Sequence, residues 1–337
     1  MDVRYMVKSF KTPGLEASRK RHRVTSLPDG FENANRRENT MRTFRVAAVS
    51  MNGFLGEPEK VLGNMAGWCE RAAVEKAELV LFPELVVHGH CTPNTWDLAD
   101  PVPDGPSVRR LVQLARHYRL VLCVGMSEKE RDIVYNTQVL VGPDGYIGKQ
   151  RKLHLSRDEV LYYKGGREIN VLDAGPCKVG IVICYDNQFP EVARILALKG
   201  ADVLLMPHAA RIKMWDDSPE SETAARRYSH WYFQGHAMRA RENFCFAVLA
   251  DQAGRAGYVD LYPKDSPNQP HHAGAALIFG PDGELLASSQ TDKIKEEMVT
   301  AALDAMLLAK HRSLPNYTLR TRRPELFGEL VKEQVSC

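Results

Sequence analysis

Hydrophobic and polar positions follow two alternating patterns along most of this chain. Short apolar runs rich in β-branched residues, typical of strands buried on both faces, are followed by stretches with apolar residues at helical spacing. In the first part, we expect strands at 44–51, 77–85 and 120–129 and helices at 57–77 and 107–118. Two more strands flank a Gly-Pro-Asp-Gly turn at 142–145. This alternation of strands and helices is typical of an α/β protein.

The same order of elements returns in the second part of the chain. We expect strands at 178–186, 201–207 and 244–251 and helices at 190–200 and 228–242. A second Gly-Pro-Asp-Gly turn, at 280–283, again lies between two strand-like segments. The repetition indicates two related halves. Two sheets with helices on their outer faces would bury all these apolar runs, and no linker separates the halves, so we expect one domain.

The composition narrows the class of protein. The 337 residues are 44% hydrophobic and 26% charged, as in soluble globular proteins. No segment reaches the roughly 18 apolar residues that a membrane helix needs, so no membrane partner is expected. The seven cysteines form neither a CxxC pair nor a metal-finger spacing. We therefore expect free thiols in a reducing compartment, the cytoplasm, in place of a disulfide framework.

The charge is distributed unevenly along the chain. Residues 1–42 contain ten Lys or Arg and five Asp or Glu, a net +5; because the whole chain carries +3, the remainder carries −2. A near-neutral body gives no reason to expect a nucleic-acid partner. The polar, aperiodic residues 1–42 are expected to form a flexible basic N-terminal arm, followed by a folded domain at 43–327 and a tail at 328–337.

Two apolar runs and one hairpin strand lead into a residue that can do chemistry. Cys184 follows the run 179–183 and precedes a helix signal at Pro190, so we expect it on a turn at the tip of a strand, where α/β proteins house their sites. Glu84 ends a second run, and Lys152 stands where a hairpin strand leaves its sheet. A free cysteine is more often a small core residue, and a lone Glu or Lys is more often a solvated surface charge. A carboxylate at the end of a buried strand nevertheless needs a partner, and lysine is the natural one.

Together these three residue types supply what an attack on an amide carbon requires. The cysteine provides the nucleophile, which must be a thiolate when it attacks. The glutamate can accept the thiol proton and pass it to the departing amine. The lysine ammonium, with the backbone N–H of Tyr185, can stabilise the oxyanion of the tetrahedral intermediate.

The segments around these residues read LFPEL at Glu84, RKLHL at Lys152 and CYDNQFPE at Cys184. They resemble the motifs of the nitrilase, or carbon–nitrogen hydrolase, superfamily, and the resemblance extends over about residues 43–327. It implies a four-layer α-β-β-α sandwich of two pseudo-symmetric halves, with a catalytic Glu-Lys-Cys triad. It also implies association through outer helices into a homodimer or larger homo-oligomer.

The resemblance implies further site residues in the loop after Lys152. Many members carry a second catalytic glutamate ahead of an aromatic pair, and Glu159 occupies that position here, with Asp158 beside it as the alternative. His154 matches a histidine near the active site in several members. The alternative is that it does no more than pack against the loop. No metal or organic cofactor is expected, because no His, Cys and acidic residues stand in a metal-binding pattern.

The residues after the nucleophile bear on the substrate. The nitrile-cleaving branch usually has Trp-Glu there, whereas Tyr185-Asp186 resembles the amidase and carbamoylase side. We therefore expect hydrolysis of a small linear amide through a thioester on Cys184, with N-carbamoyl amines or nitriles as alternative substrates. Four residues are expected to bind that substrate: His154, Tyr185, Asn187 and Gln188.

Two other classes of protein compete with this hypothesis. A non-catalytic binding or scaffold member of the same fold is disfavoured by the intact triad. A flavodoxin-like nucleotide binder is disfavoured because no Gly-rich phosphate loop follows the first strand. Within the enzyme hypothesis, no cation follows Cys184 closely, so we expect a substrate without a carboxylate near the scissile bond. Arg194 or Arg211 could overturn that expectation by folding back toward the site.

Overall fold

The structure is a computed structural model that describes residues 41–90, 92–212, 219–257, 263, 265–266, 269–289 and 294–332. Nearly all of the predicted arm at 1–42 and half of the predicted tail at 328–337 lie outside these residues, so both remain predictions. No helix in the described part of the chain is long and apolar enough to cross a membrane.

The first sheet is built mainly from the first half of the chain. Its strands, in spatial order, are β13 (Glu297–Leu303), β1 (Phe44–Ser50), β2 (Leu79–Leu81), β3 (Val121–Glu130), β4 (Ile133–Gly142) and β5 (Gly145–Arg151). The pairs β1–β2 and β2–β3 are parallel, and β3–β4 and β4–β5 are antiparallel. The last strand of the chain, β13, pairs antiparallel with the first, β1.

The second sheet repeats this plan. Its strands are β12 (Leu285–Ser288), β11 (His271–Phe279), β10 (Phe246–Arg255), β8 (Val203–His208), β7 (Lys178–Ile181) and β6 (Val171–Asp173), with β9 (Arg211–Ile212) paired to β11. The pairs β7–β8 and β8–β10 are parallel, and β10–β11 and β11–β12 are antiparallel. This is the pairing sequence of β1 to β5, which confirms the predicted pseudo-symmetry of the two halves.

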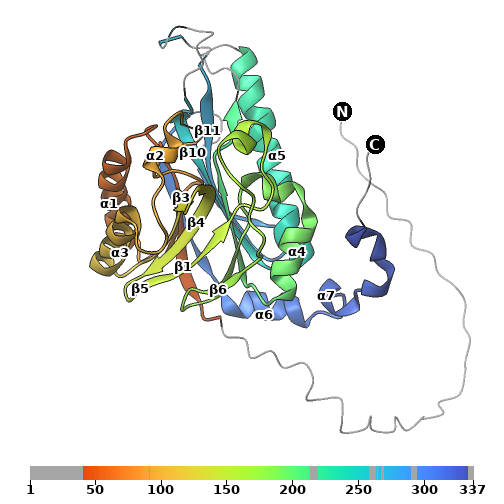
Figure 1. Cartoon of the computed structure of the whole chain (residues 1–337). Helices are drawn as coiled ribbons and strands as arrows, with labels where there is room; N and C mark the ends of the chain where they lie inside the picture. Colours follow the sequence, from red (N-terminus) through yellow and green to blue (C-terminus); the bar gives the residue numbers. More distant parts are fainter. Residues whose placement is uncertain are drawn as a thin grey trace, which may run out of the picture. The chain divides into compact units, whose positions relative to one another are not determined.

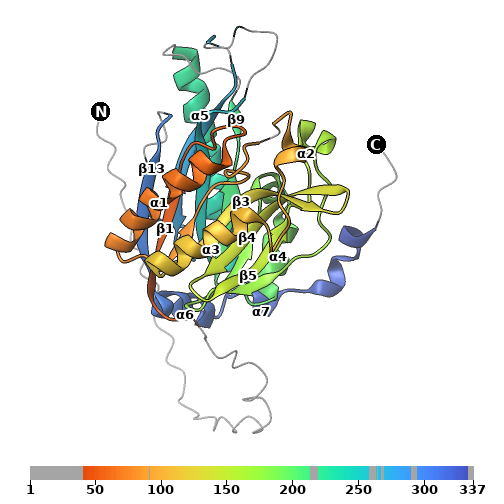
Figure 2. The same ribbon diagram turned by 60° about the vertical axis from the view of Figure 1, so that its left-hand side comes forward.

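Helices cover the outer face of each sheet. The first sheet carries α1 (Pro58–Val74) and α3 (Pro106–Tyr118), and the second carries α4 (Pro190–Leu198) and α5 (Pro219–Asn243). Figure 1 shows the two pairs of helices on opposite sides of the sheets, and in Figure 2 α1 and α3 lie side by side in front of the first sheet. The short helix α2 (Thr95–Leu98) and the C-terminal α6 (Ala305–Ser313) and α7 (Thr318–Thr321) complete the set of α-helices that the described residues form.

Alternate strand residues fill three hydrophobic layers. Val46 of β1 and Val203 of β8 lie in the core between the two sheets. Their neighbours Ala47 and Leu204 point the other way, into the cores under α1 and α3 and under α4 and α5. Because both faces of each sheet are buried, the strands read as continuous apolar runs. The arrangement is the predicted four-layer α-β-β-α sandwich.

Several boundaries differ from those expected from the sequence. The strands expected at 77–85 and 178–186 end at Leu81 and Ile181, because the chain then leaves each sheet. The helix expected at 228–242 begins earlier, at Pro219. Strand β13 and helix α6 were not expected at all.

Candidate active site

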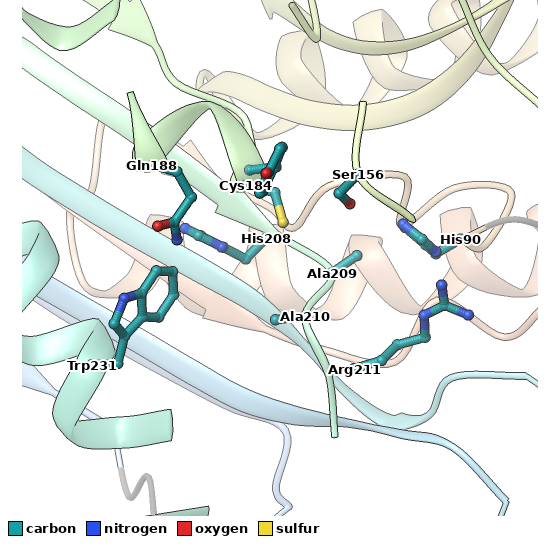
Figure 3. A pocket seen from close by; sticks show the side chains of 10 residues that line it. His90, Ser156, Cys184, Gln188, His208, Ala209, Ala210, Arg211 and Trp231 are labelled. Atoms are coloured by element: carbon teal, nitrogen blue, oxygen red, sulfur yellow. The ribbon is translucent and has the colours of Figure 1, made fainter. Parts of the chain in front are cut away.

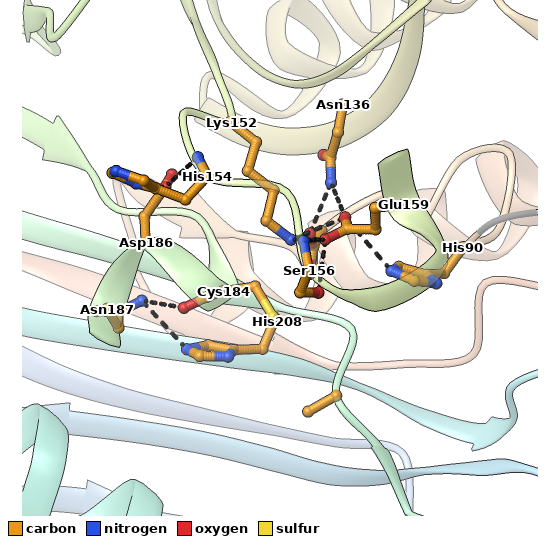
Figure 4. A network of polar contacts seen from close by, with 12 residues as sticks. His90, Asn136, Lys152, His154, Ser156, Glu159, Cys184, Asp186, Asn187 and His208 are labelled. Carbon is orange, nitrogen blue, oxygen red and sulfur yellow. Dashed lines mark hydrogen bonds and ion pairs between the residues drawn. The ribbon is translucent and has the colours of Figure 1, made fainter. Parts of the chain in front are cut away.

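The ends of three strands bring Glu84, Lys152 and Cys184 into one region between the two sheets. Glu84 lies three residues after β2, Lys152 follows β5 directly, and Cys184 lies three residues after β7. Figure 4 shows Lys152 beside Glu159, with Cys184 next to them. The structure thus brings together the residues that the sequence singled out.

A close crossing of two backbone segments places Glu84. After β2, the chain passes directly over β3, where Gly125 donates its N–H to the carbonyl of Pro83 at 3.2 Å. A Cβ atom on Gly125 would lie 2.3 Å from the backbone nitrogen of Leu85. Only glycine permits this approach, so Gly125 is required for the turn that presents Glu84.

Lys152 is buried between two carboxylates. Its Nζ donates to Oε1 of Glu84 at 2.7 Å and to both oxygens of Glu159 at 2.8 and 2.7 Å. All three side chains are 0% exposed. Asn136 Nδ2 also donates to both carboxylates, at 2.7 and 3.0 Å. The cluster holds one positive and two negative groups out of contact with water.

The charges of this cluster fix its protonation. Burial lowers the pKa of Lys152, but the negative charges around it, that of Glu84 first, raise the pKa more, and the net position is well above the usual value. Burial alone would raise the pKa of Glu159. The contact with His90 and the charge of Lys152 lower this pKa by a larger amount, so it lies below its usual range. At neutral pH, Lys152 is therefore an ammonium and Glu159 a carboxylate.

The short 3₁₀ helix Arg157–Leu161 separates the two acidic candidates. Glu159 forms a capping box with Ser156: its Oε2 accepts from the backbone N–H of Ser156 at 2.8 Å and from the hydroxyl at 2.7 Å. The same carboxylate contacts Lys152. Asp158 points elsewhere, and its Oδ1 accepts from Nη2 of Arg211 at 2.5 Å. Of the two candidates, Glu159 is the one that contacts the lysine.

Cys184 starts a second 3₁₀ helix, Cys184–Gln188, in a strained backbone conformation with φ of 46°. Asn187 holds this turn, because its Nδ2 donates to the carbonyls of Val182 and Cys184, both at 3.0 Å. Burial raises the pKa of the Cys184 thiol well above its usual value, and the charge of Glu84 raises it further. Lys152 and the backbone N–H of Ala209 oppose this shift without cancelling it. The resting group is a thiol.

Cys184 opens onto a cavity of about 510 Å³, which is a suitable volume for a small-molecule ligand. The cavity is also lined by Tyr185, Gln188, His208, Arg211 and Trp231 (Figure 3). Tyr185 and Gln188, two of the predicted substrate-binding residues, therefore line this cavity.

Two of the predicted substrate-binding residues do not line this cavity. Asn187 is buried, and its side-chain amide is occupied by the backbone of the Cys184 turn. His154 stacks on Phe189 with ring centroids 3.8 Å apart, and its Nδ1 lies 2.8 Å from Oδ1 of Asp186. The geometry gives both residues a role in packing and positioning the turn.

The sequence pattern of one family, described as "Carbon-nitrogen hydrolase", matches residues 45–312. This chain belongs to the carbon–nitrogen hydrolase family. A protein from Pyrococcus abyssi named nitrilase is 33% identical over 288 residues, which cover 84% of this chain and 98% of the relative. A protein from Francisella tularensis named citrullinase is 28% identical, with coverage of 87% and 100%. The crystal structure of a carbon–nitrogen hydrolase from Helicobacter pylori shares the fold, with a TM-score of 0.76, 23% identity and coverage of 87% and 100%.

The pocket of this carbon–nitrogen hydrolase also contains residues that no sequence pattern predicted. His90 and Ser156 line it, and Nε2 of His90 lies 3.5 Å from Oε1 of Glu159. His208 lines it from the end of β8. An internal repeat could have found this last residue, because LMPH at 205–208 corresponds to LFPE at 81–84. His90 and Ser156 stand in loops and carry no local signal.

Arg211 bears on the expectation about charge near the substrate. No cation follows Cys184 closely in the sequence, and Arg194 and Arg211 are the two residues that could supply one by folding back. Arg211 does line the same cavity as Cys184, because β9 pairs with β11 and returns the chain to the pocket. The pocket therefore contains a cation, and the expected preference for a substrate without a carboxylate near the scissile bond stays a prediction. Arg194 is not among the residues that line the cavity.

A buried network supports the wall formed by His208. Nδ1 of His236 lies 2.8 Å from the carbonyl of Tyr232 and donates to it, so its Nε2 accepts from Nε2 of His208 at 2.9 Å. Burial lowers the pKa of His236 to about 4 and that of His208 well below its usual value, so both are neutral. Asp251 accepts from the N–H of Ala210 and from the hydroxyl of Tyr232, each at 3.0 Å. The wall is held by hydrogen bonds and carries no charge on its histidines.

Three potential metal ligands converge beside the lysine. Ligand atoms of Glu84, His90 and Glu159 lie within 4.8 Å of one another. The Lys152 ammonium already bonds both carboxylates of this group. A divalent cation would meet that positive charge at close range, so the donor set fits an ammonium better than a metal ion.

Proposed function

We propose that this carbon–nitrogen hydrolase cleaves the linear C–N bond of a small amide through a thioester on Cys184 and releases ammonia or an amine. The observation that carries the proposal is the buried contact of the Lys152 ammonium with Glu84 at 2.7 Å, next to a cysteine that opens onto a small-molecule cavity. A nucleophile, a base and a cation for the oxyanion then meet at one point. No cofactor is proposed.

In the first step, the sulfur of Cys184 attacks the amide carbon and the thiol proton moves to Glu84. The raised pKa of Cys184 means that the proton has to leave during the attack. Oε2 of Glu84 is suited to receive it, because this buried oxygen has no hydrogen-bond partner among the described residues. As the C–S bond forms, the carbonyl electrons become an oxyanion, which the Lys152 ammonium and the N–H of Tyr185 stabilise.

In the second step, the C–N bond breaks and the leaving amine takes the proton held by Glu84. Water then attacks the thioester carbon, Glu84 accepts a proton from that water, and the proton returns to the sulfur as the carboxylic acid leaves. Glu159 does not touch the reacting atoms in this scheme. Its bonds to Nζ keep Lys152 charged and fixed in place, so we assign it a positioning role.

Nitriles and N-carbamoyl amines are alternative substrates for the same machinery. Relatives named nitrilase and citrullinase support these alternatives, because their names denote different C–N substrates. The non-catalytic alternative is disfavoured. Burying a lysine against two carboxylates costs desolvation free energy, and a protein that only binds or scaffolds has no need for such a cluster.

The test is ammonia release from a panel of linear amides, N-carbamoyl amines and nitriles. We expect turnover of at least one amide, loss of turnover in Cys184→Ala, and an acyl adduct on Cys184 by mass spectrometry with a slow substrate. Cys69→Ala is the matched control, because Cys69 is buried in α1 away from the pocket. An adduct on another cysteine, or a Cys184→Ala variant that retains its rate, would contradict the mechanism.

We also propose a homodimer or larger homo-oligomer in a reducing compartment such as the cytoplasm. Exposed apolar side chains on the outer helices and at the C-terminal end, among them Ile195, Met238, Leu326, Phe327 and Leu330, support association. The five cysteines that the structure describes are all free, which supports reducing conditions. Light scattering coupled to size exclusion tests the oligomer, and a monomer at micromolar concentration would contradict it.

A further inference from the structure

Ser156 is the point where the hydrogen bonds around Lys152 reach the cavity. Its Oγ lies 2.7 Å from Oε2 of Glu159, which in turn bonds Nζ of Lys152. Lys152 and Glu159 are fully buried, whereas Ser156 is half-buried and lines the cavity. Figure 3 shows the Ser156 oxygen turned toward the pocket, on the side where the Cys184 sulfur lies. A ligand can therefore meet this network through Ser156.

The hydroxyl of Ser156 can only accept a hydrogen bond from a ligand. Glu159 is ionised, because its pKa lies below the usual range, and an ionised carboxylate has no proton to donate. The Ser156 hydroxyl is therefore the donor in its contact with Glu159. Of the two lone pairs of Oγ, the capping box uses one for the backbone N–H of Glu159. The other is left for the cavity, and the bond to a carboxylate polarises the hydroxyl and makes its oxygen a stronger acceptor.

Glu159 itself has no capacity left for a ligand. Its Oε1 accepts from Lys152 at 2.8 Å and from Asn136 at 3.0 Å, and lies 3.5 Å from Nε2 of His90. Its Oε2 accepts from Lys152 at 2.7 Å, and from the backbone N–H and the hydroxyl of Ser156 at 2.8 and 2.7 Å. A carboxylate offers about four lone-pair sites, and these contacts already fill them. The acceptor that the network presents to the cavity is therefore Ser156.

The leaving nitrogen of an amide needs such an acceptor. In the tetrahedral intermediate on Cys184, the nitrogen carries N–H groups and a lone pair, and the lone pair has to meet the proton held by Glu84 before the C–N bond breaks. A hydrogen bond from one N–H to a fixed acceptor limits rotation about the C–N bond and so directs the lone pair. The alkoxy oxygen of an ester has no N–H, so it would set its own lone pairs against that of the acceptor.

We propose that Oγ of Ser156 accepts an N–H of the leaving nitrogen and thereby makes the enzyme select amides over the esters of the same acids. This inference rests on the proposed function and assigns a specificity-determining residue to it. In an amide, the C–N bond breaks and the nitrogen takes the proton from Glu84. In an ester, the C–O bond would break and the alkoxy oxygen would take that proton. The amide alone can also donate to Ser156.

The experiment compares an amide with the methyl ester of the same acid. Butanamide and methyl butanoate are the pair, and kcat/KM is measured for each from the release of butanoate. In Ser156→Ala, kcat/KM for the amide should fall by at least about tenfold more than kcat/KM for the ester. Ser156→Thr retains the hydroxyl and should keep the wild-type ratio. Ser313→Ala, at an exposed serine that ends α6, is the matched control and should leave the ratio unchanged.

Ser156→Ala also removes a bond to Glu159, and the ratio separates this effect from recognition. Looser positioning of Glu159 and Lys152 weakens the contact with the oxyanion, which forms from both substrates, so it lowers both rates by the same factor. An equal loss for the amide and the ester would therefore assign Ser156 to the support of Glu159 alone and overturn the proposal.

Binding to the Cys184→Ala variant, measured by calorimetry, keeps this inference apart from the proposed function. Cys184→Ala should bind butanamide more tightly than methyl butanoate, and the double variant with Ser156→Ala should lose most of that difference. This result would support the role of Ser156 even where no turnover is found. Turnover of butanamide with an amide-to-ester ratio that Ser156→Ala leaves unchanged would retain the hydrolase and overturn the role of Ser156.

Discussion

Glu84 and His208 occupy equivalent positions in the two halves of the sandwich. Each follows a Leu-x-Pro sequence at the end of the second strand of its half. The registers agree as well, because Leu79 lies opposite Val46 in the first sheet and Val203 lies opposite Val179 in the second. One half uses this position for a carboxylate bonded to Lys152, and the other for a neutral imidazole in the pocket wall.

The contact between Glu84 and Lys152 predicts strongly non-additive kinetics. Glu84→Gln and Lys152→Met should each lower kcat/KM by about a thousandfold or more, and the double variant should cost little beyond either one. Lys152→Arg should fail too, because a planar guanidinium does not replace a compact ammonium. Steady-state rates of the four proteins test this. Small, additive losses would assign the pair to structure.

The same cluster predicts an effect on stability. Lys152→Met leaves Glu84 and Glu159 buried without their cation, so the free energy of unfolding should fall by about 3–5 kcal/mol. Urea unfolding followed by circular dichroism measures it. Lys332→Met, at an exposed pair with Glu329, is the control and should change stability by no more than about 0.5 kcal/mol. Equal effects of the two substitutions would contradict the burial argument.

Asp251 predicts a fall in stability as the pH rises. Burial raises its pKa from 3.8 to about 8. Between these values, the unfolded chain has lost this proton while the folded chain retains it, so the free energy of unfolding decreases with increasing pH. The effect of Asp251 is clearest at pH 6.5–8. Buried His236, whose pKa is lowered from 6.5 to about 4, changes its protonation on folding only below this range, so it does not add to the slope there.

Asp251→Asn should flatten this part of the profile, because the amide does not titrate. Thermal unfolding in matched buffers at pH 6.5 and 8 compares the two proteins. The prediction fails if the wild type and the variant lose stability in parallel over this range.

Asn187 predicts a separation of rate from binding. Asn187→Ala removes two hydrogen bonds to the turn of Cys184, so two carbonyls lose a partner and the strained φ of 46° loses support. We expect a loss of stability of about 1–3 kcal/mol and a fall in kcat with little change in KM. Gln188→Ala, one residue on and exposed, should leave stability within about 0.5 kcal/mol of the wild type. A rise in KM at constant kcat would place Asn187 at the substrate instead.

Local patterns were sufficient for most of the elements and for the centre of the site. Strands buried on both faces read as apolar runs, and α1 and α3 follow their helical spacing closely. Glu84 and Cys184 could be singled out because each breaks an apolar run near a strand end, and Lys152 because it stands where a hairpin strand leaves its sheet. Strands β2 and β7 ended early for the same reason, since the chain has to leave the sheet to present Glu84 and Cys184.

Features that depend on contacts distant in sequence could not be predicted. Apolar and polar residues alternate only weakly in the segment of β13. It becomes a strand because β1 has an open edge with which it can pair. Arg211 stands 27 residues beyond Cys184 in the sequence and reaches the pocket through the β9–β11 pairing. The position of Asn187 three residues after Cys184 predicts a contact with the substrate. In the folded turn its side-chain amide instead bonds the backbone carbonyls of Val182 and Cys184, which no local pattern indicates.

The pairing of β1 with β13 has a consequence for biosynthesis. Phe44 lies opposite Leu303, so β1, the first of the described strands to leave the ribosome, waits for β13, the last of them, to complete its sheet. Until then, β1 presents an open edge of apolar residues that can pair with another nascent chain. A chain that stops before Glu297 should therefore aggregate when synthesised, whereas one that ends after Leu303 should not. Light scattering during cell-free translation of the two lengths would show this, and equal solubility of both would refute it.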